Sequence, residues 1–418
     1  MSKIEIYPKV FVADKLQKIY IKTALDGVFT IKIQAMERYG IPHTAKYRID
    51  EETRYSFLPV KKVGKDVYLI EYAFVGDQRY DVQIKNDDEI ILKTHIYSIR
   101  EEFVGLNVFK GETHVHSCRS DGAETPFELG CAYRAKGYDF IAITDHHKYY
   151  PSLEGKEIFD TLTGDFTVFR GEEVHNFGMG YFHIINFDGD FSVNEIVEER
   201  EDYVKEEISK IFETANIPNN VADKYDCAFR MFVAKEIQKG GGLAIMAHPY
   251  WDAFGEYNMQ ESSVRYLWKN GVFDALELLA GCDRRDNGNN LQVALWEELR
   301  EQGIKIPVVG ASDTHSTTNK NSLFNLQYSL VFAKDRKEIK SAIKAEFSVA
   351  VLARKNGTFF VFGRFALVKY ARFLLEEYFP QYIKLTKIHA RALKEKDESK
   401  IKRIEKKISV YKKKFFAW

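Results

Sequence analysis

The sequence predicts an α/β protein, because short apolar segments alternate with stretches of helical character through the middle of its 418 residues. The apolar segment 140–144 follows the helix-like stretch 126–136, and 243–247 follows 222–239 in the same way. A further repetition of the pattern lies between residues 275 and 310. Such alternation is typical of parallel strands, arranged either as a barrel or as an open sheet.

The first 105 residues follow a different pattern, in which apolar and polar residues alternate with period two. This period indicates half-buried strands, and glycines and the Asn86-Asp-Asp sequence separate them as turns. We therefore predict a β-sandwich-like accessory domain over residues 1–105 and an α/β domain over 106–362. The expected strands are 4–7, 28–33, 67–72, 80–84 and 90–96.

Residues 363–418 form a third predicted part, a basic helical tail. From Ala366 onward it holds 15 Lys and Arg against 6 Asp and Glu. Three interpretations stay open for it: a solvated helical hairpin, a contact for nucleic acid or another polyanion, and an oligomer interface. Residues 191–218 are instead acidic and predict a solvated inserted helix near the mouth of a site.

Composition limits the classes of function. The formal net charge is zero, so the chain as a whole has no general attraction for nucleic acid or acidic membranes. The first residues have no secretory h-region and no apolar stretch reaches about 18 residues, so we expect no membrane partner. The four cysteines are scattered, which predicts reduced thiols in a cytoplasmic protein.

Histidine and carboxylate side chains are concentrated directly after the apolar segments. Eight of the 11 histidines lie in such clusters. Because the carboxyl ends of parallel strands converge at one face, these side chains are expected to form one site. The clusters are His114 with His116, Asp121, Asp145 to His147, Glu172 to His175, His183, His248, and Asp313 with His315.

This combination of ligand types predicts a metal centre. In an extended segment residues 114 and 116 point to the same face, so both imidazoles can reach one ion. Mixed imidazole and carboxylate ligands suit zinc, manganese or iron, and so many of them predict two or three divalent ions. Such ions lower the pKa of bound water toward about 7, which makes hydrolysis the expected chemistry. No serine or cysteine nucleophile motif and no phosphate-binding glycine loop occurs.

The order of the motifs resembles the polymerase and histidinol phosphatase (PHP) superfamily. His-x-His, Ser-Asp-Gly, Thr-Asp-His, Gly-x-Glu, Ala-His-Pro and Ser-Asp-x-His follow one another between about residues 108 and 355. Within the superfamily the chain looks most like the stand-alone metal-dependent phosphoesterases. The resemblance implies a distorted (β/α)7 barrel with a trinuclear site.

The resemblance also implies a role for each matching residue. Glu173 is favoured over Glu172, because the motif is Gly-x-Glu and Gly171 fixes the count. His175 departs from the usual pattern, and it could replace His183 as a ligand or contact the substrate. Glu173, Asp313 and His248 would be catalytic by holding the activated water. The implied sets are His114, His116, Glu173 and Asp313 for one metal, Glu173, His183 and His248 for the second, and Asp121, His146 and His315 for the third.

A phosphate ester also needs cationic or polar contacts beyond the metals. His147, Lys148, Arg284 and Arg285 are candidates, together with His175. The expected function is hydrolysis of a small organic phosphate or nucleotide. The alternatives are an exonuclease or oligonucleotide phosphodiesterase that uses the basic tail, a carboxylic or carbamate ester hydrolase, and a non-catalytic scaffold. The sequence leaves the oligomeric state open.

Overall fold

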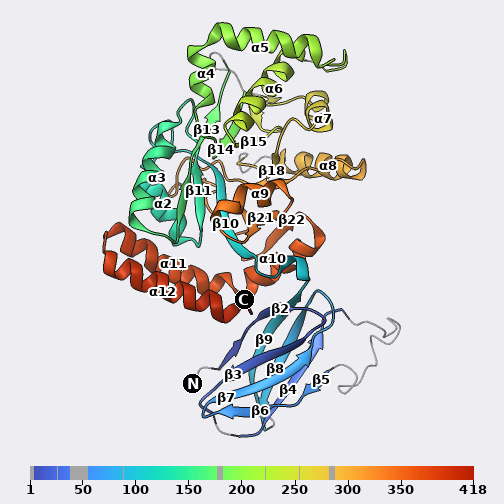
Figure 1. Cartoon of the computed structure of the whole chain (residues 1–418), viewed down its shortest axis with the longest axis vertical. Helices are drawn as coiled ribbons and strands as arrows, with labels where there is room; N and C mark the ends of the chain where they lie inside the picture. The colour runs from blue at the N-terminus through green and yellow to red at the C-terminus, as the bar shows by residue number, and fades with distance from the viewer. Residues whose placement is uncertain are drawn as a thin grey trace. The chain divides into compact units, whose positions relative to one another are not determined.

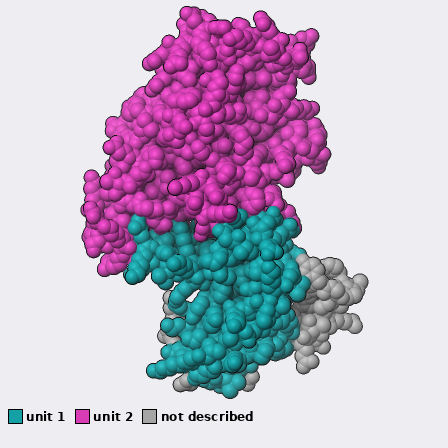
Figure 2. All heavy atoms as spheres, viewed as in Figure 1, with its two compact units in different colours: residues 1–106, 369–382, 405–418 teal, residues 107–368, 383–404 magenta. Residues whose placement is uncertain are grey.

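The computed structural model describes residues 4–25, 27–37, 55–87, 89–176, 182–221, 223–253, 255–281 and 288–418. The chain divides into two compact units, which Figure 2 shows in different colours. Unit 1 comprises residues 1–106, 369–382 and 405–418, and unit 2 comprises residues 107–368 and 383–404. The C-terminal helices therefore contribute residues to both units.

The described residues of unit 1 form two sheets, with strand orders β1-β3-β7-β6 and β2-β9-β8-β4-β5. The two sheets share one apolar core, in which Ile19 and Ile70 of the first meet Ile31 and Val82 of the second. Each of the five expected strands is present, while β2, β3, β5 and β6 were not predicted. The strands are β1 (Glu5–Tyr7), β2 (Val10–Val12), β3 (Leu16–Lys22), β4 (Phe29–Ala35), β5 (Ser56–Leu58), β6 (Lys61–Gly64), β7 (Val67–Ala73), β8 (Gln78–Asn86) and β9 (Glu89–Ile99).

Unit 2 is a mixed α/β structure, as the alternation of segments predicted. Its principal sheets have the orders β12-β11-β10-β20-β21-β22 and β13-β14-β15-β18-β19. The strands are β10 (Asn107–Val115), β11 (Phe140–Ile143), β12 (Thr167–Phe169), β13 (Gly171–Val174), β14 (Ile184–Phe187), β15 (Leu243–Met246), β18 (Ala275–Leu279), β19 (Val308–Gly310), β20 (Gln327–Ala333), β21 (Ser348–Ala353) and β22 (Phe359–Phe362), with the small pair β16 (Asp252–Ala253) and β17 (Glu256–Tyr257).

The distorted (β/α)7 barrel that the resemblance implied is not confirmed, because no closed barrel is seen in the described residues. The strands form separate sheets, and their directions are mixed. β14 runs antiparallel to both β13 and β15, and β10 pairs in parallel with β11 but antiparallel with β20. A barrel of repeated β–α units would instead keep one strand direction throughout.

In chain order the α-helices separate or follow the strands of unit 2, and Figure 1 labels them. The predicted helix 126–136 is α2 and 222–239 is α6, and α8 lies within the repetition expected between residues 275 and 310. The acidic stretch 191–218 forms two helices, α4 and α5, and the predicted hairpin of the tail has three. The bounds are α2 (Pro126–Ala135), α3 (Tyr150–Leu162), α4 (Val193–Glu199), α5 (Glu201–Thr214), α6 (Lys224–Lys239), α7 (Glu261–Lys269), α8 (Gly288–Glu301), α9 (Ile339–Lys344), α10 (Phe365–Glu377), α11 (Phe379–Lys394) and α12 (Glu398–Phe415), with short 3-10 turns at Glu101–Phe103 and Arg336–Glu338.

The start of α2 shows how local sequence fixes an element beside the predicted metal ligands. Thr125 caps the helix by accepting a hydrogen bond from the backbone N–H of Glu128, whose carboxylate accepts one from the backbone N–H of Thr125. Pro126 occupies the first turn, where its missing N–H costs nothing. This capping box ends the loop that contains Asp121.

The strand β15 explains why the central segments are apolar without alternation. Leu243 and Ile245 face the core that the two sheets of unit 2 share, whereas Ala244 and Met246 face the core beneath α6, α7 and α8. Both faces of the strand are buried, as is usual for strands covered on two sides. None of the described helices is long and apolar enough to cross a membrane.

Gly111 provides a test of packing between β10 and β11. It lies opposite Phe140 in the parallel ladder, and a Cβ atom there would lie 1.8 Å from Phe140 Cζ. We expect Gly111→Ala to lower the free energy of unfolding by roughly 1–3 kcal/mol through overpacking. Gly164→Ala is the matched control, because nothing lies within 4 Å of a Cβ atom at that position. Equal urea midpoints for the two variants would contradict this account of the packing.

Candidate metal centre

The predicted ligands lie close together because they are in or near strand ends that meet at one edge of unit 2. His114 lies in β10 and His116 directly follows that strand, while His146 follows β11. His183 precedes its strand, β14, whereas the other ligands lie in a strand or after one. It still lies beside them, because β14 runs antiparallel to its neighbours. The first residue of β14 therefore lies at the same edge as the last residues of β13 and β15. Glu173 lies in β13, His248 follows β15, and Asp313 and His315 follow β19.

His114, His116 and Asp313 form the first group. Asp313 Oδ1 lies 2.9 Å from His116 Nε2 and 3.3 Å from His114 Nε2, and the two Nε2 atoms are 3.1 Å apart. Glu173 Oε2 lies 3.4 Å from His114 Nε2 and 3.5 Å from His116 Nε2. These four side chains are the set that the family resemblance implied for one metal.

A second group surrounds the other oxygen of Glu173. Its Oε1 lies 2.6 Å from His183 Nδ1 and 3.4 Å from His248 Nε2, and these two nitrogens are 3.3 Å apart. One carboxylate therefore faces two sets of imidazoles, which is the arrangement expected of a bridging ligand.

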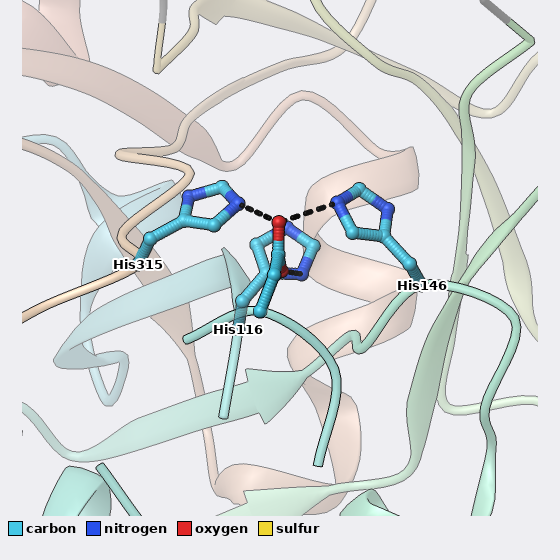
Figure 3. A group of neighbouring side chains, drawn as sticks. His116, His146 and His315 are labelled. Carbon is cyan, nitrogen blue, oxygen red and sulfur yellow. Dashed lines mark ion pairs between the residues drawn. The ribbon is translucent and has the colours of Figure 1, made fainter. Parts of the chain in front are cut away.

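Asp121, His146, His315 and His116 form the third group. Figure 3 shows His315 and His146 directed from two sides at one carboxylate oxygen, with His116 beside the same carboxylate. Asp121 Oδ2 lies 3.2 Å from His315 Nε2 and 3.6 Å from His146 Nε2, and Asp121 Oδ1 lies 3.8 Å from His116 Nδ1. This group is the most open part of the cluster, because the side chain of Asp121 is 54% exposed and that of His315 is 39% exposed.

Unsatisfied buried atoms indicate that these residues suit divalent cations. Glu173 Oε2, Asp313 Oδ1 and His116 Nδ1 are buried and have no hydrogen-bond partner among the described residues. Imidazole nitrogens lie within ion-pair distance of both carboxylate oxygens, but no hydrogen bond satisfies these oxygens. A cation bound beside them would lower the cost of burying their charge. Four overlapping groups have ligand atoms within 4.8 Å of one another: His116, Asp121, His146 and His315; His114, Glu173 and His248; His114, His116 and Asp313; and His146, Glu173 and His175.

The electrostatics of the cluster also prepare it for cations. Burial alone would raise the pKa of Glu173 and of Asp313, but the surrounding histidines hold both well below their usual range. Burial lowers the pKa of His116 to about 4, so its imidazole is neutral at pH 7. Burial would also lower the pKa of His146, but the carboxylates of Glu173 and Asp121 raise it to about 10. The cluster thus combines ionised carboxylates with imidazoles that a metal can bind once their protons leave.

Glu277 is a residue of the centre that the sequence analysis missed. Its Oε1 lies 2.9 Å from His114 Nδ1, and its Oε2 accepts a hydrogen bond of 3.1 Å from the backbone N–H of His248. This contact leaves His114 Nε2 directed at the candidate ligands Glu173 and Asp313. Second-sphere carboxylates commonly orient a ligating histidine in this way. The sequence signal that could have identified Glu277 is a charged residue inside the apolar segment Ala275-Leu-Glu-Leu-Leu. The structure shows that this side chain is buried.

The neighbouring Glu172 has a different role from Glu173. Its carboxylate accepts hydrogen bonds from the side chains of Asn186, Ser192 and Asn194 and from the backbone N–H of Val193. These donors satisfy it fully without a metal. The structure therefore directs Glu172 toward the start of α4 and Glu173 toward the histidines.

His175 and His183 both lie beside Glu173, so the structure leaves both as candidate ligands. His175 Nε2 is 2.8 Å from His146 Nδ1 and 4.0 Å from Glu173 Oε2. The ring of His147 stacks on that of His175 with centroids 4.2 Å apart.

The remaining substrate-contact candidates are less central. His147 Nδ1 lies 2.9 Å from Glu198 Oε1 on α4. Lys148 Nζ donates to the backbone carbonyl of Arg119. Arg284 and Arg285 lie outside the described residues.

Comparison with known proteins gives a local sequence relative. The chain is 39% identical over 109 residues to the DNA polymerase/3′-5′ exonuclease PolX of Bacillus subtilis, a match that covers 24% of this chain and 18% of the relative. The chain thus spans less than a fifth of that protein's length. No protein-family model matches the chain.

Several solved structures are partly similar. A two-domain protein of Bacteroides vulgatus with a predicted PHP-like metal-dependent phosphoesterase domain is 18% identical over 59% of this chain and 66% of its own, with a TM-score of 0.42. A proposed metal-dependent phosphoesterase of Bifidobacterium adolescentis is 16% identical over 56% of this chain and 95% of its own, with a TM-score of 0.38. The first of these structures contains a domain described as PHP-like, and PHP is the superfamily that the ordered motifs resemble.

Removing the charge of Glu277 tests its positioning role. We expect Glu277→Gln to weaken metal binding by roughly 10–100-fold, since second-sphere partners typically have effects of this size. Competition with a chromophoric chelator measures the affinity, and circular dichroism checks the fold. Glu298→Gln is the control, because Glu298 pairs with Arg265 on the surface. An affinity equal to that of the control would rule out this role.

Proposed function

We propose, from the premise that this is a PHP superfamily chain, that it is a metal-dependent phosphoesterase that hydrolyses a small organic phosphate. The observation that supports this most directly is the continuous histidine–carboxylate cluster, in which Glu173 Oε2 and Asp313 Oδ1 are buried without hydrogen-bond partners. Phosphoryl groups need concentrated positive charge, and a set of divalent cations held here would provide it.

The proposed ligands are those that the resemblance implied, with two or three zinc, manganese or iron ions. Bound divalent cations supply Lewis acidity, which polarises a phosphoryl oxygen and makes water a better nucleophile at neutral pH. His114, His116, Glu173 and Asp313 would hold one ion. Glu173, His183 and His248 would hold a second, with His175 as the alternative to His183, and Asp121, His146 and His315 would hold a third.

The residues of the chain define where substrate approaches. His114 and His116 are fully buried, so bulk water is excluded from that end of the cluster. Asp121 and His315 are the exposed end, and the loops that follow β10 and β19 carry them. A phosphate ester would therefore enter from the side of Asp121 and His315. Glu277 keeps His114 in one tautomer while this occurs.

Substitution of the ligands tests the proposal. We expect Asp313→Asn and His248→Ala each to lower kcat/KM for p-nitrophenyl phosphate by roughly 100-fold or more, because preorganised charge at the reacting phosphoryl group is lost. Chelation should abolish turnover, and added zinc or manganese should restore it. Asp202→Asn, on the exposed start of α5, is the control.

The substrate panel also separates the alternatives. Turnover of carboxylic or carbamate esters alone would replace the proposal with that hydrolase activity. A chain that binds metal but turns over no ester of either kind would be a scaffold. Phosphoester turnover that survives complete metal removal would refute the proposed chemistry.

A second candidate function is cleavage of an oligonucleotide by the same centre. Lys384, Lys387 and Arg391 lie on α11 at helical spacings of three and four, so they share one exposed face. None of the three forms an ion pair with a described residue. Exposed cations in a row without carboxylate partners favour a polyanionic ligand.

Neutralising this row tests the second candidate. We expect the combined Lys384→Gln, Lys387→Gln and Arg391→Gln variant to bind single-stranded RNA more weakly, with a salt-dependence slope smaller by about 2 for three lost phosphate contacts. Fluorescence anisotropy at several salt concentrations measures the slope, and turnover of p-nitrophenyl phosphate should stay unchanged. A slope identical to that of the unmodified chain would exclude this face as a nucleic-acid contact.

A further inference from the structure

Trp251 is placed beside the metal centre by a tight turn after β15. Its backbone N–H donates to the carbonyl of His248 at 3.0 Å, and its own carbonyl accepts from the backbone N–H of Asn258 at 2.9 Å. The β16–β17 pair lies between these two contacts. Both backbone polar groups of Trp251 are therefore fixed within a few residues of a candidate ligand.

The indole ring lies against two histidines of the centre. Its centroid is 5.5 Å from that of His183, with the planes tilted by 38°, and 5.4 Å from that of His248, with the planes at 74°. Both imidazoles contact Glu173 Oε1. An aromatic surface thus borders the group of ligands that Glu173 would bridge.

The environment of Trp251 differs from that of the tryptophans in the apolar core. Trp268 and Trp296 are buried in the apolar core beneath α6, α7 and α8, and so is Tyr250, the residue just before Trp251. Trp251 is not among the described residues of that core, and it keeps part of its surface exposed. A large aromatic ring that is partly accessible next to a reaction centre is suited to ligand contact.

We propose that Trp251 stacks on a planar aromatic ring in the organic part of the substrate, so that the centre selects nucleotide-like or aryl phosphates over aliphatic ones. The proposal rests on the proposed phosphoesterase activity and names its substrate class. Stacking of a base on an aromatic side chain contributes about 1–3 kcal/mol, which is roughly a 5- to 150-fold effect on binding.

The charge of the surroundings favours a short substrate. Glu198 on α4 contacts His147, whose ring stacks on His175 beside Glu173. A carboxylate of α4 therefore lies on this side of the centre, and it would repel an extended polyanion. A single nucleotide has little charge beyond the phosphate that the centre would bind.

Two substrates that differ in the ring test the proposal. We expect Trp251→Ala to lower kcat/KM for adenosine 5′-monophosphate by about 5- to 150-fold, mainly through KM, and for glycerol 3-phosphate by less than about twofold. Trp251→Phe should keep most of the preference. Tyr257→Ala is the matched control, because Tyr257 is exposed on the same hairpin and contacts Tyr250, with no ring contact to a histidine of the centre among the described residues.

Binding measured without metal separates this proposal from the activity itself. Saturation-transfer NMR of adenosine with the metal-free chain should show ring-proton signals for the unmodified protein and the Tyr257→Ala variant, and none for Trp251→Ala. Adenosine binding together with absent phosphoester turnover would refute the phosphoesterase activity and leave the ring contact standing. Adenosine signals unchanged by Trp251→Ala, or equal losses with both phosphate esters, would overturn the stacking role.

Discussion

The contact between the buried carboxylate of Glu173 and the imidazoles around it is the interaction on which the rest of unit 2 depends. The side chain of Glu173 is only 1% exposed, and five imidazoles lie within 3.5 Å of its two oxygens. An ionised carboxylate in such a place is tolerable only when opposite charge surrounds it. The strand ends must therefore bring histidines from distant parts of the sequence to one point. The antiparallel β14 is a consequence, because it brings His183 to the edge where its neighbours end.

Three further buried glutamates hold these strand ends together. Glu112 in β10 accepts hydrogen bonds from the backbone N–H and the hydroxyl of Ser312, next to Asp313. Glu172 secures the start of α4, and Glu277 joins His114 to the backbone of His248. Each network links two segments far apart in sequence. Since buried polar networks are stabilising only when fully satisfied, they specify one arrangement of the loops that contain the ligands.

The sequence predicted the α/β class and singled out the histidines and carboxylates that the structure brings together as candidate ligands, because histidines after apolar segments are unusual and occur in a known order. It did not predict the supporting glutamates. Glu277 interrupts an apolar segment that still looks like a strand. Its partner His114 is 163 residues away in the sequence. It also missed the mixed strand directions, since periodicity shows that a segment is extended but not which neighbour it pairs with. The sequence did not identify Trp251 as a residue of the site for a similar reason. Its place there depends on contact with His183, which is distant in the sequence.

The zero net charge of the chain conceals a separation of charge that matters more for function than the sum. Acidic residues gather on α4 and α5 and basic residues on α11 and α12, so the two kinds cancel only in the total. Local potential, not net charge, governs which ligands approach a site. The contact between Glu198 and His147 places part of the acidic group at the centre itself. An anionic substrate must therefore gain from the cations of the centre more than it loses to these carboxylates. That condition is easiest to meet for a small ester with one phosphate close to the metals, whereas each additional phosphate of a long chain adds repulsion outside the reach of the metals.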